Sequence, residues 1–278
     1  MRIDSHQHFW KYNPIRDQWI TDEMAVIRRD FLPEDLFLEL RANQIDGCIA
    51  VQADQSEAET KFLLDLAKQN SFVRGVVGWV DLRADNLAKR LADLSRDTKL
   101  RGFRHIVQAE PDDRFMLQPQ FLKGIGCLSE LGFTYDILIY PRQLLAAIEL
   151  VARCPNQSFV IDHLAKPEIK ARRTAPWAEQ MREIATNPNV YCKVSGVITE
   201  ADWKKWQPDD FKPYLDTVFE VFGPERIMFG SDWPVCLLAG SYSQVIQLIA
   251  SYTKDFSPSD KEKIFGLNAA RFYGIADC

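Results

Sequence analysis

Residues 2–8 read RIDSHQH, and we predict that this stretch forms the first β-strand of the fold. Because alternate residues of a strand point to the same face, His6 and His8 should project their imidazoles into one space. Asp4 should share that face, one pleat deeper. Two imidazoles so placed are suited to binding one metal ion or one polarised oxygen. The alternative is a pair of structural histidines hydrogen-bonded to their neighbours.

Seven further apolar segments follow the first, and a longer amphipathic stretch separates each from the next. Several are apolar on both faces, as is typical of parallel strands covered by helices on one side and packed side chains on the other. We therefore predict eight strands. They span residues 2–8, 46–53, 74–80, 100–107, 133–139, 158–163, 189–195 and 226–231.

The stretches between the strands carry signals for helix starts. Pro33 is followed by two acidic residues, and both features favour the first turn of a helix. Ser56, followed by glutamates, predicts a second helix start, and Pro141 predicts a third. Ser259 and Glu262 have the spacing of a capping box, so a helix start is predicted there as well.

Strands that alternate with helices in this way predict a single-domain (β/α)8 TIM barrel spanning residues 1–278, with right-handed crossovers. The length of 278 residues suits one closed α/β barrel. An open, doubly wound sheet is the alternative architecture. The G-x-G-x-x-G turn that marks dinucleotide-binding members of that class does not follow residues 2–8.

The composition limits the kinds of molecule that the chain is expected to bind. The formal charge is −5 and no cluster of Lys and Arg stands out, which argues against nucleic-acid binding. No apolar run approaches the roughly 20 residues that span a bilayer, and the N-terminus lacks the layout of a signal peptide. Six scattered cysteines without a C-x-x-C pair predict reduced thiols and a cytoplasmic location. The expected partner is a small molecule, and the oligomeric state is left open.

The chain has four histidines, and the two outside the first strand also fall at predicted strand ends. His105 lies at the end of the fourth strand and His163 at the end of the sixth. In a (β/α)8 barrel the carboxyl ends of the strands carry the active site. Asp232 follows the eighth strand, which neighbours the first in a closed barrel, so we predict that it approaches His6 and His8. A turn aspartate in the SDWP segment is the alternative.

Other residues near the strand ends are weaker candidates for substrate binding. Arg104 could donate a fork of hydrogen bonds to a substrate oxygen, but neighbouring strand positions face opposite ways. Loop charges could bind substrate or be ordinary solvated charges, and tryptophans could stack on a sugar ring or simply pack the loops. The long connection of residues 9–32 could form a lid. The charges are Asp162, Lys166 and Glu200, and the tryptophans are Trp10, Trp79, Trp203, Trp206 and Trp233.

Six short motifs run through the chain in order: DSHQHFW at 4–10, GWVDL at 78–82, GFRH at 102–105, DHLAKP at 162–167, KVSGVITEADW at 193–203 and MFGSDWPV at 228–235. Together they resemble the sugar-lactonase branch of the amidohydrolase superfamily, the L-fuconolactonase and L-rhamnonolactonase type. The resemblance runs from about residue 2 to about residue 273. It implies a (β/α)8 barrel that hydrolyses an aldonolactone to the open aldonic acid, with a small-molecule sugar lactone as its partner.

The resemblance also implies roles for four residues. His6 and His8 match the strand-one pair of the family, His163 its later histidine, and Asp232 its strand-eight aspartate. A carboxylate beside imidazoles keeps a low pKa and can take a proton from water, so Asp232 would activate the attacking water. His163 would orient that water or protonate the leaving ring oxygen.

The chain departs from the wider superfamily at two strands. The fifth carries no histidine, and the fourth has His105 where a bridging lysine often stands. We therefore expect at most one divalent ion, with zinc as the candidate, and the alternative is a site without metal. The ligands of that ion would be His6, His8, Asp232 and, in one variant, His163.

The oxyanion that develops on a lactone carbonyl would be stabilised by the strand-one histidines, by any bound ion, and by His105 or Arg104. No G-x-S-x-G turn is present, so direct attack of water is expected. Two alternatives stay open. One is a non-oxidative decarboxylase or amide hydrolase of the same superfamily, and the other is a non-catalytic barrel that acts as a binding protein.

Overall fold

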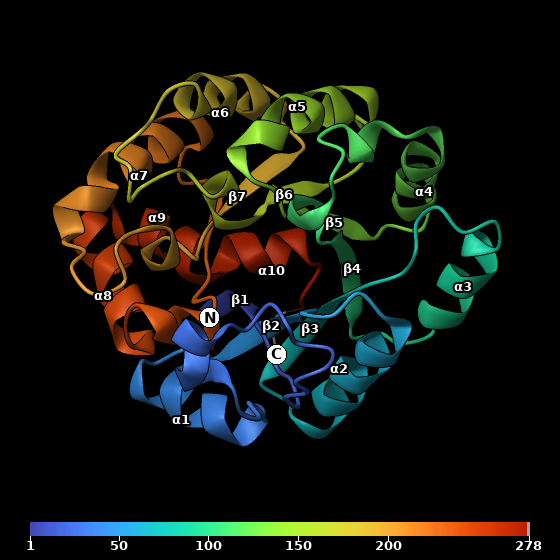
Figure 1. Ribbon diagram of the computed structural model, residues 1–278, viewed down its shortest axis with the longest axis horizontal. Helices are drawn as coiled ribbons and strands as arrows, with labels where there is room; N and C mark the ends of the chain where they lie inside the picture. Colours follow the sequence, from blue (N-terminus) through green and yellow to red (C-terminus); the bar gives the residue numbers. More distant parts are fainter. Residues whose placement is uncertain (277–278) are drawn as a thin grey trace.

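The computed structural model describes residues 1–276 and confirms the predicted (β/α)8 barrel. Eight parallel strands follow one another in chain order, each paired with the next (Figure 1). Backbone hydrogen bonds join the two ends of the sheet, from Asp232 N to His6 O over 2.8 Å and from His8 N to Trp233 O over 2.7 Å. The strands are β1 (Ile3–Gln7), β2 (Gly47–Val51), β3 (Val73–Gly78), β4 (Leu100–His105), β5 (Thr134–Ile137), β6 (Phe159–Ile161), β7 (Val190–Val194) and β8 (Ile227–Phe229).

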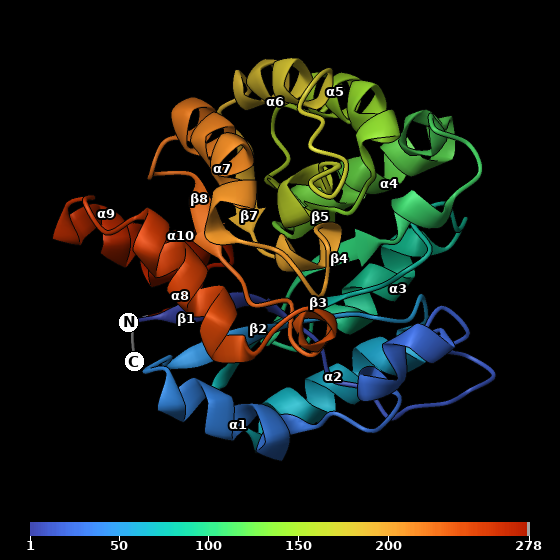
Figure 2. The same cartoon turned by 60° about the vertical axis from the view of Figure 1, so that its left-hand side comes forward.

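Helices surround the strands on the outside, as the two views in Figures 1 and 2 show. The last helix differs, because its Ala269 and Phe272 pack in the same apolar cluster as Ile3 and Val160 of the barrel interior. It therefore closes one end of the barrel. The helices are α1 (Pro33–Ala42), α2 (Glu57–Gln69), α3 (Leu87–Leu94), α4 (Pro119–Glu130), α5 (Leu144–Arg153), α6 (Trp177–Ala185), α7 (Pro208–Phe222), α8 (Tyr242–Tyr252), α9 (Pro258–Glu262) and α10 (Asn268–Phe272).

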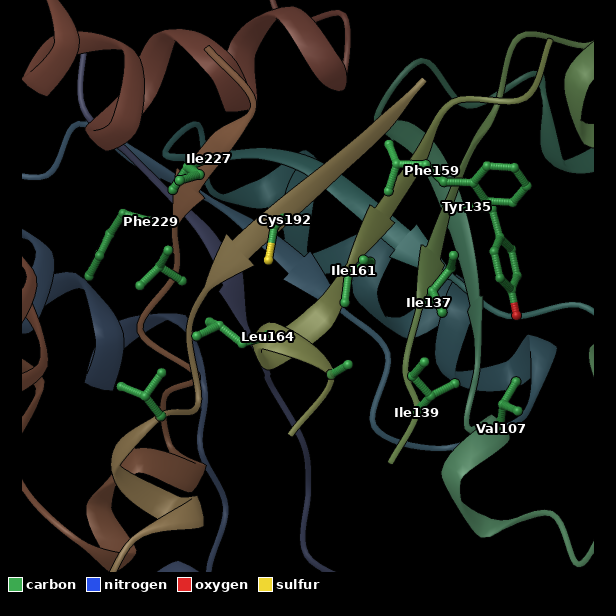
Figure 3. Packing of buried hydrophobic residues seen from close by; sticks show 14 of the residues in the cluster. Val107, Tyr135, Ile137, Ile139, Phe159, Ile161, Leu164, Cys192, Ile227 and Phe229 are labelled. Carbon is green, nitrogen blue, oxygen red and sulfur yellow. The ribbon is translucent and has the colours of Figure 1, made fainter. Parts of the chain in front are cut away.

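Side chains of β5 and β6 alternate between the barrel interior and the layer beneath the helices. In β5, Tyr135 and Ile137 pack outward (Figure 3), and Asp136 between them points into the barrel. In β6, Phe159 and Ile161 pack outward in the same way. Every second residue of these two strands thus faces the barrel axis, whether it is apolar or charged.

Three of the four predicted helix starts are confirmed. Pro33 is the first residue of α1, where its missing N–H is not needed. Ser56 caps α2, because its hydroxyl oxygen accepts the N–H of Glu59 over 3.1 Å. Pro141 opens a short 3-10 turn, Pro141–Gln143, that leads directly into α5.

The fourth predicted helix start was wrong by two residues. Ser257, and not Ser259, caps α9, and its hydroxyl oxygen accepts the N–H of Asp260 over 3.1 Å. Pro258 then occupies the first helical position, which its fixed φ favours. The proline therefore decides the boundary, and the spacing of Ser259 from Glu262 has no capping role.

Within residues 1–276, no helix is both long and apolar enough to cross a bilayer. The cysteines within residues 1–276 are free thiols, as the sequence predicted. Cys278 lies outside the described residues. The cytoplasmic location stays a prediction.

Candidate active site

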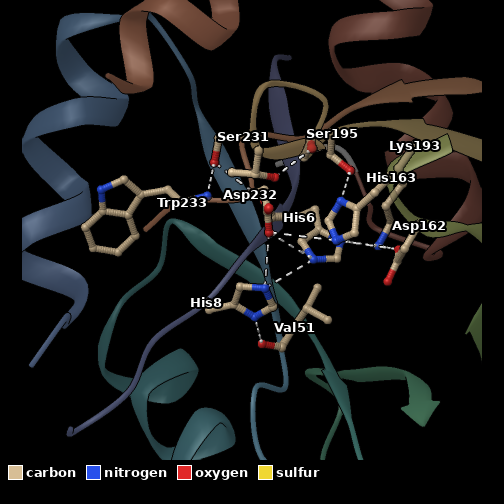
Figure 4. Close-up of polar contacts among 12 residues, drawn as sticks. His6, His8, Val51, Asp162, His163, Lys193, Ser195, Ser231, Asp232 and Trp233 are labelled. Atoms are coloured by element: carbon tan, nitrogen blue, oxygen red, sulfur yellow. Dashed lines mark hydrogen bonds and ion pairs between the residues drawn. The ribbon is translucent and has the colours of Figure 1, made fainter. Parts of the chain in front are cut away.

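Three side chains meet where the first and last strands come together. His6 lies in β1, His8 directly after it, and Asp232 shortly after β8. His6 Nε2 lies 3.2 Å from His8 Nε2, and Asp232 Oδ1 lies 3.4 Å from His8 Nε2 and 3.8 Å from His6 Nε2 (Figure 4). All three side chains are buried. The closure of the barrel thus brings the carboxylate to the histidine pair.

A buried network holds the segment that carries Asp232. Asp4 accepts the Ser231 N–H over 2.9 Å, the Ser231 hydroxyl over 2.5 Å and the Tyr242 hydroxyl of α8 over 3.0 Å. Asp232 itself has a left-handed backbone with φ of 57°, which residues other than glycine seldom adopt. The prediction that Asp4 shares the face of His6 was wrong. An irregularity in the β1–β2 pairing just after Asp4 turns its side chain outward, toward α8.

The hydrogen bonds of His8 decide which of its nitrogens is free. Its Nδ1 lies 2.7 Å from Val51 O, a carbonyl that can only accept, so Nδ1 carries the proton. In the neutral ring, the lone pair of Nε2 faces Asp232 Oδ1, a second acceptor, at 3.4 Å. Two lone pairs that point at the same position are typical of the ligand atoms of a cation site. With His6, they offer three ligand atoms that lie within 4.8 Å of one another.

His163 faces Asp232 from a third strand. It lies in the 3-10 turn Asp162–Ala165 after β6 with a left-handed φ of 53°, and its Nε2 is 3.8 Å from Asp232 Oδ1. Its Nδ1 is 2.9 Å from Ser195 Oγ. Burial lowers the pKa of His163 to about 4, so the ring is neutral at pH 7. Gly196 provides the room for this ring, since a Cβ there would lie 2.5 Å from His163 Nδ1.

Asp232 is ionised in these surroundings. Burial alone would raise the pKa of its carboxyl group, but the imidazoles of His163, His8 and His6 lower that pKa well below its ordinary value. A buried carboxylate that stays ionised beside the neutral imidazole of His163 can accept a proton from a bound molecule. The arrangement therefore suits general-base chemistry on water.

A group of four buried charges lies beneath the histidines, and two of them, Asp136 and Lys193, were not predicted as site residues from the sequence. Arg104 Nη1 lies 3.0 Å from Asp162 Oδ2, and Lys193 Nζ lies 2.5 Å from Asp136 Oδ2 and 3.1 Å from Asp162 Oδ1. None of the four side chains is more than slightly exposed. Asp162 is thus no solvated loop charge. The available signal was a single charge inside an otherwise apolar strand, as in FTYDILI and NVYCKVS.

Arg104 and His105 are neighbours in β4 and so face opposite ways. Arg104 points into the barrel, whereas the ring of His105 stacks on Phe115 outside it, with centroids 4.8 Å apart. Trp79 Nε1 donates to His105 Nδ1 over 3.2 Å, and His105 Nε2 lies 2.7 Å from Glu110 Oε1. The structure therefore does not support the predicted catalytic role of His105 or the predicted substrate contact of Trp79. The strand alternation places His105 behind the barrel wall, and its hydrogen bond holds the Trp79 indole there.

A cavity of about 300 Å³ opens beside Asp232 and is large enough for a small-molecule ligand. Trp10 and Trp19, from the long connection after β1, form one wall with ring centroids 5.9 Å apart. Trp233 does not line the cavity, because it is buried against Phe31 with centroids 5.2 Å apart, so its predicted substrate contact is not supported. The lining residues are His8, Trp10, Trp19, Ala53, Arg104, Ile106, Gln108, Ala109, Leu138, His163, Lys166, Asp232 and Val235.

The loop residues predicted as substrate ligands divide into two groups. Lys166 lines the cavity, and Glu200 lies behind it as an ion-pair partner, with Nζ and Oε1 3.4 Å apart. Trp203 and Trp206 donate their indole N–H groups to backbone carbonyls of the surrounding loops over 2.8 and 2.7 Å. Loop packing, which was the alternative for these tryptophans, therefore explains Trp203 and Trp206.

The family of the chain follows from comparison with known proteins. A sequence model described as amidohydrolase matches residues 3–275. The chain belongs to the amidohydrolase family. A protein named L-fucono-1,5-lactonase, from Burkholderia multivorans (strain ATCC 17616 / 249), is 41% identical over 288 residues, which cover 100% of this chain and 97% of the relative. A second protein of that name, from Burkholderia ambifaria, is 37% identical and covers 99% of this chain and 96% of its own length.

A solved structure is similar to this amidohydrolase over its whole length. It is a crystal structure of an amidohydrolase from Burkholderia multivorans with bound zinc, with a TM-score of 0.96 and 42% identity, covering 99% of this chain and 100% of the other. The chain offers two groups of side chains that could hold an ion. They are His6, His8 and Asp232, and His6, Asp162 and His163.

Proposed function

We propose that this amidohydrolase is a lactonase that hydrolyses a sugar aldonolactone of the L-fuconolactone or L-rhamnonolactone type to the open aldonic acid. One observation carries the proposal. The ionised Asp232 and the neutral His163 border a cavity in a chain that is 41% identical, over its full length, to an L-fucono-1,5-lactonase. A lactone carbonyl is electrophilic enough for water to attack it directly, so no covalent nucleophile is required.

In the proposed mechanism Asp232 takes a proton from water as the water oxygen bonds to the lactone carbonyl carbon. The guanidinium of Arg104 lines the cavity and stabilises the oxyanion that develops. The bond from the carbonyl carbon to the ring oxygen then breaks, and that oxygen receives the proton through Asp232 or His163. One water is consumed, and the product carries a carboxyl group and a free hydroxyl.

We further propose that His6, His8 and Asp232 hold one divalent ion, with zinc as the candidate. Their converging acceptors fit such an ion, as described above. A bound ion of this kind supplies Lewis-acid polarisation of a carbonyl or of water. The substrate would be held by Lys166 and by the faces of Trp10 and Trp19, which line the cavity.

The direct test is an assay of the full chain on a panel of aldonolactones. We expect acid release well above spontaneous ring opening for at least one L-fucono-, L-rhamnono-, galactono- or arabinonolactone, followed with a pH indicator. The same assay with added zinc and with a chelator measures the contribution of a metal ion. Formation of carbon dioxide from an aromatic acid, or of an amine from an amide, would favour the rival reactions. No turnover on any substrate would favour a binding protein.

Replacing His105 by Asn should leave kcat within about threefold of the wild type, because the ring lies outside the barrel wall. The loss of its hydrogen bonds and stacking should lower the free energy of unfolding by about 1–2 kcal/mol. Lactone turnover and denaturant unfolding measure the two effects. A hundredfold loss of kcat in a folded variant would return His105 to the catalytic group.

We also propose a cytoplasmic location and a small-molecule partner alone. The support is the scattered pattern of the cysteines and the charge of −5 without a basic cluster.

A further inference from the structure

Lys193 of β7 lies inside the barrel beneath the active site and is fully buried. Its Nζ lies 2.5 Å from Asp136 Oδ2, 3.1 Å from Asp162 Oδ1 and 3.2 Å from His6 Nδ1. Two carboxylates and one imidazole are also a ligand set that divalent metal ions prefer. The ammonium group therefore occupies what is chemically a cation site.

A second protein cation completes this arrangement. Arg104 Nη1 lies 3.0 Å from the other oxygen of Asp162 and 3.3 Å from the other ring nitrogen of His6. Both carboxylate oxygens of Asp162 and both nitrogens of His6 thus have a cationic side chain as a neighbour. Lys193 and Arg104 also balance the charges of Asp136 and Asp162, two against two, in a region with little water to screen a further charge.

His6, Asp162 and His163 are the second group of side chains that could hold an ion, and two of them contact Lys193. We propose that Lys193 is a built-in substitute for a second metal ion, so that the intact chain binds at most one divalent ion, at His6, His8 and Asp232. Lys193 is then a positioning residue, because it orients His6 and Asp162 without touching the substrate. The inference concerns metal binding and does not depend on a lactone being the substrate.

The test removes the ammonium group and keeps its acceptors. In Lys193→Ala, Asp136 and Asp162 would face a vacated cation site. His6, whose Nε2 belongs to the first site, would have to release the proton of Nδ1 to bind the second ion as well. We expect zinc bound at saturation to rise from about one to about two ions per chain, since the buried carboxylate of Asp136 would be left without a cation partner, which is strongly destabilising. Equilibrium dialysis followed by elemental analysis measures the number of ions. Zinc should also raise the Tm of Lys193→Ala more than that of the wild type, because the ion replaces a lost charge.

The surface of the protein offers a matched control. Lys212 Nζ lies 2.7 Å from Asp216 Oδ2, and the Tyr252 hydroxyl donates to Asp216 over 2.9 Å. This ion pair at the surface repeats the buried contacts of Lys193 with Asp136, which also accepts a tyrosine hydroxyl. Lys212→Ala should keep the zinc content and the zinc-dependent Tm of the wild type. The double variant Lys193→Ala/Asp162→Asn loses one ligand and should not bind the additional ion.

Three results would overturn the proposal. The first is a wild-type chain that already binds two zinc ions inside the barrel. The second is a folded Lys193→Ala variant with the zinc content of the wild type. The third is a Lys193→Ala variant that is unfolded without zinc, by circular dichroism, and stays unfolded when zinc is added. None of these results bears on lactone hydrolysis, so a failure here is distinct from a failure of the proposed function.

Discussion

Asparagine in place of Asp232 should lower kcat for the aldonolactone by about 10²–10⁴-fold, the range that general-base catalysis supplies. The amide has nearly the same shape as the carboxylate but cannot accept a proton from water at pH 7. Because the amide is neutral, the variant no longer buries a charge at this position, so the barrel should stay folded. Initial rates above the spontaneous opening of the lactone, together with thermal unfolding, measure both effects.

The control for this variant is Asp112→Asn. Asp112 lies exposed in the loop after β4, where its carboxylate accepts the N–H of Arg114 over 2.9 Å. The charge change is the same, but no imidazole or cavity is involved, so kcat should stay at the wild-type value. Turnover of Asp232→Asn close to that of the wild type would remove Asp232 from its proposed role.

Methionine in place of Arg104 should lower the free energy of unfolding by about 3–5 kcal/mol, as when one partner of a buried ion pair is removed. Arg104 donates to Asp162 and to the backbone oxygen of Gln52, and its side chain is almost entirely buried. Without it, Asp162 keeps only Lys193 as a charged partner for two carboxylate oxygens. Because Arg104 also lines the cavity, kcat should fall in whatever fraction of the variant is folded.

An exposed ion pair provides the comparison. Arg142 and Asp113 are in contact, and each side chain is about half exposed. Arg142→Met should change the free energy of unfolding by no more than about 1 kcal/mol, because water already solvates both charges. Urea unfolding of the two variants gives the contrast directly. Equal effects of Arg104→Met and Arg142→Met would mean that Asp162 does not need the guanidinium.

Two features could be predicted from the sequence. One is the order of strands and helices, and the other is that the first and eighth strands are neighbours. Apolar segments with a period of two, separated by helix-start signals, are local features, and they are enough to predict eight strands. Once the barrel is closed, its first and eighth strands are neighbours. The approach of Asp232 to His6 and His8 follows from that single topological fact.

The sequence was a poorer guide to which residues of a strand face the barrel interior and which face the helices. Arg104 and His105 had to face opposite ways, but both faces of β4 are buried, so no contrast between apolar and polar residues marks the interior. The structure places Arg104 inside and His105 outside. Asp4 was assigned to the wrong face because a local irregularity in strand pairing interrupts the alternation.

The sequence by itself determined the eight strands, their order, and the meeting of two histidines and an aspartate where the barrel closes, because hydrophobic period and chain order are properties of neighbouring residues. Only the tertiary structure decided that Lys193, Asp136 and Asp162 neutralise one another beneath that site. They come from β5, from the turn after β6 and from β7, so a whole helix separates each from the next along the chain. A charge can stay buried only where such partners surround it, and no local pattern records where they will be.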